Sequence, residues 1–257
     1  MSERRNKLVS FDWPAVVQKV RARTPARLLE GRSGAAYRTG TQMELREAHA
    51  AARDAVRTEL DLQRDFGSAF VEQWKLFEVS TQAGDKDEYL LRPDLGRRLS
   101  EESRAQVSSL CPYDRDLQIL IGDGLSVTAV AKQVPSLLPL LHEEALKRQW
   151  TTGRCFCVRH CRVGLLNEVG ELLVPKVAIL LIGERPGLAT AESLSAYLAY
   201  RPTKSHTDAE RNLISNIHDR ATRPRQAAVR ILDLAAQMMK AESSGFSLRE
   251  QSPVLER

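Results

Sequence analysis

The strongest hydrophobic pattern in the chain is the unbroken apolar run VAILLI at residues 177–182, which Gly183 ends. A run this rich in branched side chains, with no polar position, is typical of a parallel strand covered on both faces. LQILIG at residues 117–122 and CFCVRH at residues 155–160 predict two further strands. After the first run, Pro186 and Gly187 predict a turn, and Ser193 predicts the cap of a helix over residues 194–200.

Helical patterns alternate with these strands. Residues 127–149 predict a helix with a break at Pro135, and residues 224–241 predict a long final helix that ends near Gly245. Residues 207–210, TDAE, have the pattern of a capping box that opens another helix. The alternation predicts an α/β fold, a Rossmann-like parallel sheet with covering helices, over residues 97–257.

Residues 1–96 predict a mainly helical N-terminal region that carries partner contacts. Residues 13–29 have an early proline and Gly31 just past their end, as helices commonly do. Within residues 41–62, apolar side chains recur at helical spacing and predict a helix that packs by one stripe; they are Met43, Ala48, Ala52, Val56 and Leu60. A further amphipathic segment contains Phe70, Trp74 and Phe77 and is broken at Gly84.

Composition narrows the class of protein. A chain of 257 residues can bury one large core, or a core and a smaller satellite. No apolar stretch approaches the roughly 20 residues of a membrane span, and the start MSERRNK lacks the apolar part of a secretory signal. These features predict a cytoplasmic protein with no membrane partner. The net charge of +5 is modest and its basic residues alternate with acids, which disfavours nucleic-acid binding.

The four cysteines predict neither disulfides nor a metal site. Three lie within residues 155–161, which is no disulfide framework in a chain of this size, so we expect reduced thiols. Cys155 and Cys157 would share one face of a strand, whereas zinc knuckles use a two-residue gap in a tight turn. His160 and Cys161 therefore need no metal, and none is expected.

Polar residues follow two of the predicted strands directly. Glu184 and Arg185 come after the apolar run, at the edge where open α/β sheets bind their ligands. A surface ion pair worth under about 1 kcal/mol is the alternative, but the flanking Gly183 and Pro186 favour ligand contact. After the strand at 155–160, Arg162 could bind a phosphate while Val163 offers backbone and apolar surface. An ordinary surface arginine is an equally good interpretation of Arg162.

GDGLS, residues 122–126, stands where a dinucleotide fold has its phosphate turn. Val127 occupies the place of the third glycine, so a tight strand-to-helix turn capped by Ser126 is favoured. A free-standing NAD-binding Rossmann-like oxidoreductase stays the alternative. His218 follows no nucleophile signature, and no residue is assigned a catalytic role.

Six segments, in order, resemble one known family. They are RTPARLLEGRSG (23–34), YLLRPDLGRRLSEES (89–103), IGDGLS (121–126), FCVRHCRVGLLNEVGELL (156–173), IGERPGLATAESLSAY (182–197) and HTDAERNLISNIH (206–218). Together they resemble the small (light) subunit of ethanolamine ammonia-lyase across nearly the whole chain. The set is highly specific, whereas GDG alone would indicate little.

The resemblance implies a subunit of an adenosylcobalamin-dependent lyase that converts ethanolamine to acetaldehyde and ammonia. In that family the large subunit, a (β/α) barrel, holds ethanolamine and carries the radical chemistry, while the small subunit completes the cobalamin site. It implies a hetero-oligomer with the large subunit, with six copies of each expected. It leaves open whether a bacterial microcompartment encloses the enzyme.

The family's cobalamin contacts carry over to Val163 in CRV, Glu184 in GERPG and Leu213 in NLISN. Some members have cysteine at the position of Leu213, so only an apolar or backbone contact can remain there. We add Arg162 and Arg185, because the cofactor carries a phosphate and many amides. The Asp-x-His-x-x-Gly pattern of base-off cobalamin proteins is missing, which suggests that the cofactor keeps its own lower ligand.

The chain also departs from the family's pattern. Cys155, Cys157 and Cys161 stand where the family usually has Pro, Phe and Gly. Small apolar fillers are the expected role of these cysteines.

Overall fold

The computed structural model describes residues 14–24, 26–248 and 250, and its centre is a six-stranded mixed sheet. In spatial order the strands are β3 (Glu78–Ser80), β5 (Phe156–Arg159), β4 (Leu117–Gly122), β6 (Val177–Gly183), β7 (Leu194–Tyr200) and β8 (Asn212–Ile217). The first four are parallel, and β7 runs antiparallel to both of its neighbours. The expected α/β fold with covering helices is confirmed, with an antiparallel extension at one side.

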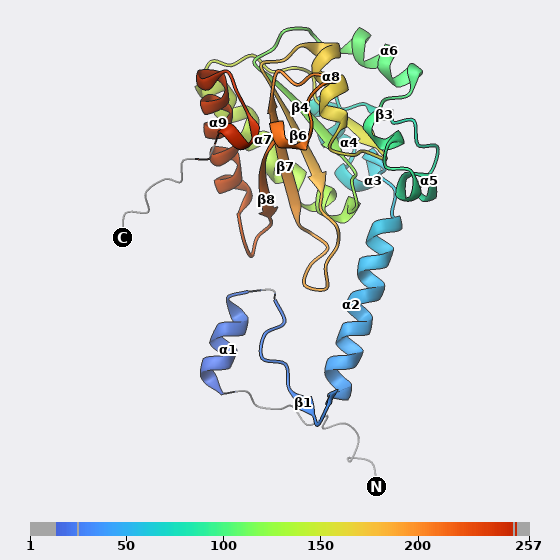
Figure 1. Ribbon diagram of the computed structural model, residues 1–257, viewed down its shortest axis with the longest axis vertical. Coiled ribbons are helices and arrows are strands. Elements are labelled where there is room, and N and C mark those ends of the chain that lie inside the picture. Colours follow the sequence, from blue (N-terminus) through green and yellow to red (C-terminus); the bar gives the residue numbers. More distant parts are fainter. Residues whose placement is uncertain (1–13, 25, 249, 251–257) are drawn as a thin grey trace.

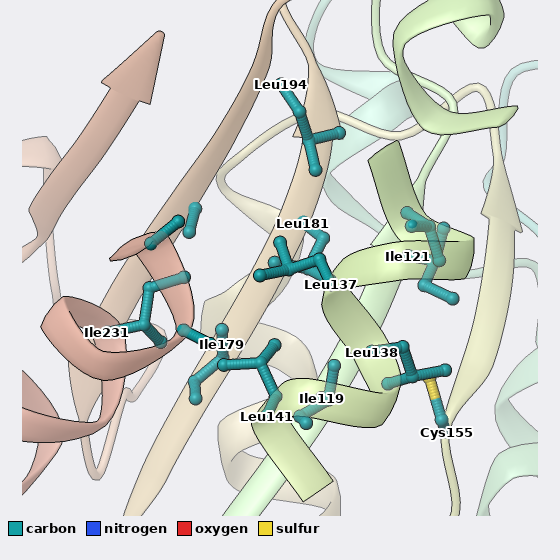
Figure 2. Packing of buried hydrophobic residues seen from close by; sticks show 14 of the residues in the cluster. Ile119, Ile121, Leu137, Leu138, Leu141, Cys155, Ile179, Leu181, Leu194 and Ile231 are labelled. Carbon is teal, nitrogen blue, oxygen red and sulfur yellow. The ribbon is translucent and has the colours of Figure 1, made fainter. Parts of the chain in front are cut away.

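Helices cover both faces of this sheet (Figure 1). On one face lie α7 (Val127–Lys147) and α9 (Pro224–Ala241), and on the other α6 (Glu101–Leu110) and α8 (Leu165–Leu173). Side chains of a strand point alternately to the two faces, so Ile179 and Leu181 pack with α7 and α9 while Leu180 packs with α8. Figure 2 shows Ile179 and Leu181 among Leu137 of α7 and Ile231 of α9. This double cover explains the unbroken apolar run of β6.

Helix α7 is continuous from Val127 to Lys147, so the expected break at Pro135 is wrong. Both Pro135 and Pro139 lie inside it. An interior proline costs a helix about 3 kcal/mol. Burying a leucine stabilises by about 1.5–3 kcal/mol, and this helix fully buries Leu137, Leu138 and Leu141, among others. Packing against the sheet therefore outweighs the two missing hydrogen bonds.

The expected helix over residues 194–200 is also wrong, because this segment is strand β7. It pairs with β6 along its whole length and with β8 on its other side. Leu194, Ala196 and Leu198 share the α7 and α9 face of the sheet, which is the two-residue period of a strand.

The capping box at residues 207–210 exists but opens no α-helix. The Glu210 carboxylate accepts from Thr207 N at 2.6 Å, and Thr207 Oγ1 accepts from Ala209 N at 3.2 Å. Only a single 3-10 turn, Asp208–Glu210, follows, and β8 begins at Asn212. Leu213 and Asn216, which follow the capping box, lie in strand β8, because this segment pairs with β7. His218 lies buried just past the strand's end.

The N-terminal part forms an arm that extends away from the sheet (Figure 1). We call residues 14–24 and 26–57 the arm; it contains α1 (Ala15–Ala22), the short pair β1 (Arg32–Ser33) and β2 (Ala36–Tyr37), and α2 (Thr39–Arg57). Within the described residues the expected stripe of α2 is only partly covered: Met43 is 60% exposed, while Ala48, Ala52 and Val56 are half-buried. Only the last turns of α2 reach the rest of the molecule, where α2 contacts α7.

The helix expected at residues 13–29 is shorter in the structure. Of the helix expected at residues 13–29, the structure describes α1 up to Ala22, and Trp13 lies outside the described residues. Three short helices follow α2, namely α3 (Leu62–Phe66), α4 (Ser68–Trp74) and α5 (Lys86–Leu91). Strand β3 was not predicted, and it lies before residue 97. A domain boundary between residues 96 and 97 stays a prediction.

Within the described residues, no helix has the length and apolarity that crossing a membrane requires.

Candidate functional site

A pocket of about 320 Å³ opens at the carboxyl ends of β4, β5 and β6. The turns that follow these strands supply Gly124, Arg162, Val163, Glu184 and Arg185 to its wall. Strands β7 and β8 supply the opposite wall, with Ser195, Tyr197, Leu213, Ser215 and Asn216. The pocket therefore lies at the edge where open α/β sheets bind ligands.

All five residues expected from the sequence line this one pocket: Arg162, Val163, Glu184, Arg185 and Leu213. They come from three separate segments of the chain. Leu213 presents an apolar surface, with 46% of the residue exposed. The structure thus places the five residues together, and what they bind stays a proposal.

The Glu184 carboxylate is fixed by two neighbours and keeps one free oxygen. Its Oε1 accepts from Ser195 Oγ at 2.6 Å and from Asn216 N at 2.9 Å. No donor among the described residues is bonded to Oε2. Glu184 and Arg185 form no ion pair with each other among the described residues, and Arg185 is exposed. The carboxylate is therefore oriented by the sheet and can still accept a hydrogen bond from a ligand.

Arg162 is held against Tyr89 of α5. Its guanidinium lies 4.2 Å from the centroid of the Tyr89 ring, and Nη2 donates to the Tyr89 carbonyl at 3.0 Å. The Tyr89 hydroxyl in turn donates to the Cys161 carbonyl at 3.1 Å. Stacking of this kind restricts a long side chain at little entropic cost. Arg162 is thus a positioned cation at the pocket wall, unlike an ordinary surface arginine.

Asp123, between the two glycines of GDGLS, supports the turn that follows β5. It is fully buried; its carboxylate accepts from His160 N at 2.9 Å and from Cys161 N at 2.8 Å, and Lys86 Nζ lies 3.2 Å away. Lys86 is itself only 6% exposed and also donates to the Gly124 carbonyl. The buried ion pair therefore ties the turn after β4 to the turn that presents Arg162 and Val163.

The GDGLS turn has the structural role favoured from the sequence. Ser126 Oγ accepts from Ala129 N at 3.2 Å and caps α7. Gly124 has φ +57°, and a Cβ there would lie 2.5 Å from the Gly183 carbonyl oxygen. The glycines thus allow two turns to approach closely, and the buried charge of Asp123 occupies the turn where a dinucleotide fold would bind pyrophosphate. Nothing in this geometry favours the dinucleotide alternative.

The four cysteines are free and buried. Burial raises the pKa of the Cys111 thiol to about 11 and raises the pKa of Cys157 and Cys161 well above the ordinary value. Cys155 and Cys157 pack in the core on the α7 side of the sheet and Cys161 on the α8 side. They fill the core as expected. Among the described residues, no group of His, Cys, Asp and Glu has the arrangement of a metal site.

Several pocket residues were not predicted. Ser195 and Asn216 were missed because their segments were interpreted as helical. Tyr197 lines the pocket, and burial together with the nearby Glu184 charge raises its pKa. No local pattern indicated Tyr89, since α5 meets the turn after β5 only in the folded chain. Asp123 does not line the pocket but supports it, and an acid between two glycines after a buried strand was a usable signal.

These observations define an α/β protein with a pocket of polar and apolar side chains at the carboxyl edge of its sheet. The family profile "Ethanolamine ammonia-lyase light chain (EutC)" matches residues 14–249. The chain belongs to this ethanolamine ammonia-lyase family.

Curated relatives agree with this assignment. The ethanolamine ammonia-lyase small subunit of Clostridium perfringens is 40% identical over 231 residues, which cover 90% of this chain and 76% of that protein. The small subunit of Clostridium acetobutylicum is 37% identical over 233 residues, 91% of this chain and 94% of that protein. The small subunit of Listeria innocua is 38% identical over 231 residues, 90% of this chain and 77% of that protein.

Proposed function

We propose that this chain is the small subunit of an adenosylcobalamin-dependent ethanolamine ammonia-lyase and that its pocket completes the cobalamin site against a large subunit. The observation that carries the proposal is the meeting of Arg162, Val163, Glu184, Arg185 and Leu213 in one pocket. When bound, adenosylcobalamin supplies the radical chemistry, and the large subunit holds ethanolamine. This chain contributes binding and orientation.

The residues present fit such a cofactor. The free Oε2 of Glu184 can accept from an amide on the rim of the corrin ring, and Leu213 and Val163 offer apolar surface beside it. Arg162 and Arg185 are cations for its phosphate or for its carbonyl groups. The donor set thus matches the amides, hydroxyls and phosphate of cobalamin.

The size of the pocket supports a shared site. Pockets that enclose a drug-sized ligand measure about 300–1,000 Å³, and this one, at about 320 Å³, is at the lower end of that range. A corrinoid is larger than most drug-sized ligands, so the pocket can cover only one edge of it. A second protein surface must cover the rest, which is the role proposed for the large subunit.

Co-expression with the large subunit tests the assembly. We expect a hetero-oligomer with six copies of each chain, measured by native mass spectrometry, and cobalamin-dependent release of ammonia from ethanolamine. The chain alone should release none. Ammonia release by this chain alone would overturn the proposal.

Glu184→Gln tests the pocket itself. The substitution should weaken cobalamin binding by the assembled complex by about 1–3 kcal/mol, the cost of losing a charged hydrogen-bond partner. Assembly and the apparent affinity for ethanolamine at saturating cofactor should not change. Equilibrium dialysis measures the cofactor affinity, and Glu192→Gln, an exposed carboxylate of the same loop, is the matched control. Equal affinity in wild type and Glu184→Gln would show that Glu184 does not contact the cofactor.

A further inference from the structure

A second cavity, of about 570 Å³, lies beside α8 and outside the pocket described above. Basic side chains dominate its wall, and we call it the basic cavity: Arg97, Arg98, Arg104, Lys204, His206 and Arg211. Only three carboxylates line it. The basic cavity shares no lining residue with the pocket at the carboxyl edge. The two come closest in sequence in the turn after β5, where Val163 lines the pocket and Gly164 lines the basic cavity.

The carboxylates of the basic cavity leave part of its positive charge unpaired. Glu168 Oε2 accepts from Leu99 N at 2.7 Å and its Oε1 lies 3.6 Å from Arg104, while Asp208 pairs with Arg211. Lys204 pairs with Glu171, which lies outside the lining. Among the described residues, neither Arg97 nor Arg98 pairs with a carboxylate, although both are exposed on the wall. Arginines without a carboxylate partner are common on protein surfaces, so Arg97 and Arg98 alone do not indicate an anion site.

Arg211 is a buried cation, and one of its donors has no hydrogen-bond partner among the residues that the structure describes. Its side chain is 4% exposed, Nη2 donates to Asn167 Oδ1 at 2.9 Å, and Nε is buried with no hydrogen bond. His206 Nδ1 is likewise buried without a partner. Buried donors are nearly always bonded in native proteins.

The electrostatics of the basic cavity point the same way. Burial lowers the pKa of the Arg211 guanidinium, Asp208 opposes that effect, and the positive charge of Arg97 lowers the pKa further. Arg97 is thus close enough for two like charges to act on each other. A bound anion would relieve this repulsion and accept from the open donors.

We propose that the basic cavity binds the phosphate group of a small molecule. Guanidinium groups bind tetrahedral phosphate oxygens in a bidentate way, and phosphate offers more acceptor oxygens than a single carboxylate does. The cavity exceeds the size of a bare phosphate ion, so a phosphate ester fits as well as the free ion. Arg97, Arg98 and Arg211 form the phosphate contacts, and the site does not depend on cobalamin.

Calorimetric titration of the full chain with potassium phosphate, and separately with ribose 5-phosphate, tests the proposal at constant ionic strength. We expect saturable binding and a Kd at least tenfold weaker in Arg97→Gln/Arg98→Gln. Arg97→Lys keeps the charge but loses the bidentate geometry, so it should fall between the two. The matched control is Arg223→Gln/Arg225→Gln, which removes two exposed arginines at the start of α9. It should bind as the wild type does.

The outcomes separate the possible sources and the possible failures. Tighter binding of ribose 5-phosphate supports a phosphate ester, and equal or tighter binding of inorganic phosphate supports the free ion. Absence of saturable binding to both would overturn the proposal, as would equal weakening in the control variant. If Arg97→Gln/Arg98→Gln binds phosphate normally but no longer assembles with the large subunit, the basic cavity is a protein contact and the proposal is wrong.

Discussion

The arm and the sheet region of this chain have similar helical patterns but opposite surroundings. In the sheet region, the apolar side chains of α7 and α9 are buried against the strands. In the arm, α1 buries none of its residues, and Val16, Leu29 and Met43 are each more than half exposed. An amphipathic pattern therefore shows that a helix has an apolar side, but it does not show that the same chain covers that side.

The arm nevertheless reaches the part of the molecule that carries the candidate site. Arg27 donates to the carbonyl of Leu188, in the loop between β6 and β7 that begins with Glu184. In Figure 1 this loop extends from the sheet toward the arm. Exposed apolar patches commonly mark protein contacts. The exposed apolar side chains of the described part of the arm agree with the proposal made above that a large partner covers this side of the sheet.

Removing an ion pair should change the free energy of unfolding much more in the sheet region than in the arm, and this is the largest difference expected between the two regions. Asp123→Asn leaves the buried Lys86 ammonium without a counter-charge, which should lower the free energy of unfolding by about 3–5 kcal/mol. Glu30→Gln in the arm removes the carboxylate that pairs with Arg21, the two side chains being 13% and 30% exposed, and should cost under about 1 kcal/mol. Urea denaturation measures both. Similar losses would show that the arm is as tightly held as the sheet region.

Lys86→Met in the Asp123→Asn background is the control for this interpretation. It removes the unpaired charge, so it should recover part of the lost stability. A further loss of stability would mean that the hydrogen bond from Lys86 to the Gly124 carbonyl, in the turn after β4, contributes more than the unpaired charge costs.

Truncating an apolar side chain should give the second-largest difference in unfolding free energy between the sheet region and the arm. Leu137→Ala removes a fully buried side chain of α7 and should lower the free energy of unfolding by about 2–5 kcal/mol. Met43→Ala removes an apolar side chain that is 60% exposed in α2, and should change stability by less than about 0.5 kcal/mol in the chain alone. In the complex with the large subunit, Met43→Ala should weaken assembly if the arm is covered there. A large effect of Met43→Ala on the isolated chain would contradict the exposed position of α2.

Much of the sheet could be predicted because both faces of its central strands are buried. β4 and β6 are covered on both faces, so nearly every position is apolar and the pattern is unambiguous. β7 was mistaken for a helix because Ser193 supplied a capping signal, while the period of two at Leu194, Ala196 and Leu198 was short. β3 has three residues and gave no periodic signal. Long-range pairing decides such segments.

The candidate site was predicted only in part. Glu184 and Arg162 follow apolar strands directly, so the topology of an α/β sheet brings them to one edge. Val163 follows the same strand as Arg162, whereas Leu213 was identified only through the family resemblance. Tyr89, which holds Arg162 in place, comes from α5, far away in the sequence, and nothing local indicates that contact. Residues that position a site from another element are therefore the hardest to predict.

The smallest expected effect concerns a partly exposed carboxylate at the edge of the sheet region. Asp116 precedes β4 and bonds to Thr151 N at 2.7 Å, to Thr151 Oγ1 at 2.8 Å and to Lys176 Nζ at 2.8 Å. Burial raises the pKa of Asp116, but the bonds from Lys176 and Thr151 outweigh burial, so its pKa lies below the ordinary value. A depressed pKa stabilises the fold above the unfolded-state pKa, and this contribution disappears as the pH falls through the folded-state value.

Asp116→Asn should therefore cost under about 1 kcal/mol at pH 7, because solvent screens the exposed part of this cluster. The difference from the wild type should shrink below the unfolded-state pKa of about 3.9. Urea denaturation at pH 7 and pH 3 measures it, and Asp87→Asn is the control. Asp87 pairs with Arg57 at the end of the arm with both side chains more than 60% exposed, and its removal should have no measurable effect. An Asp116→Asn effect that grows toward pH 3 would show that Asp116 stabilises the fold through its protonated form.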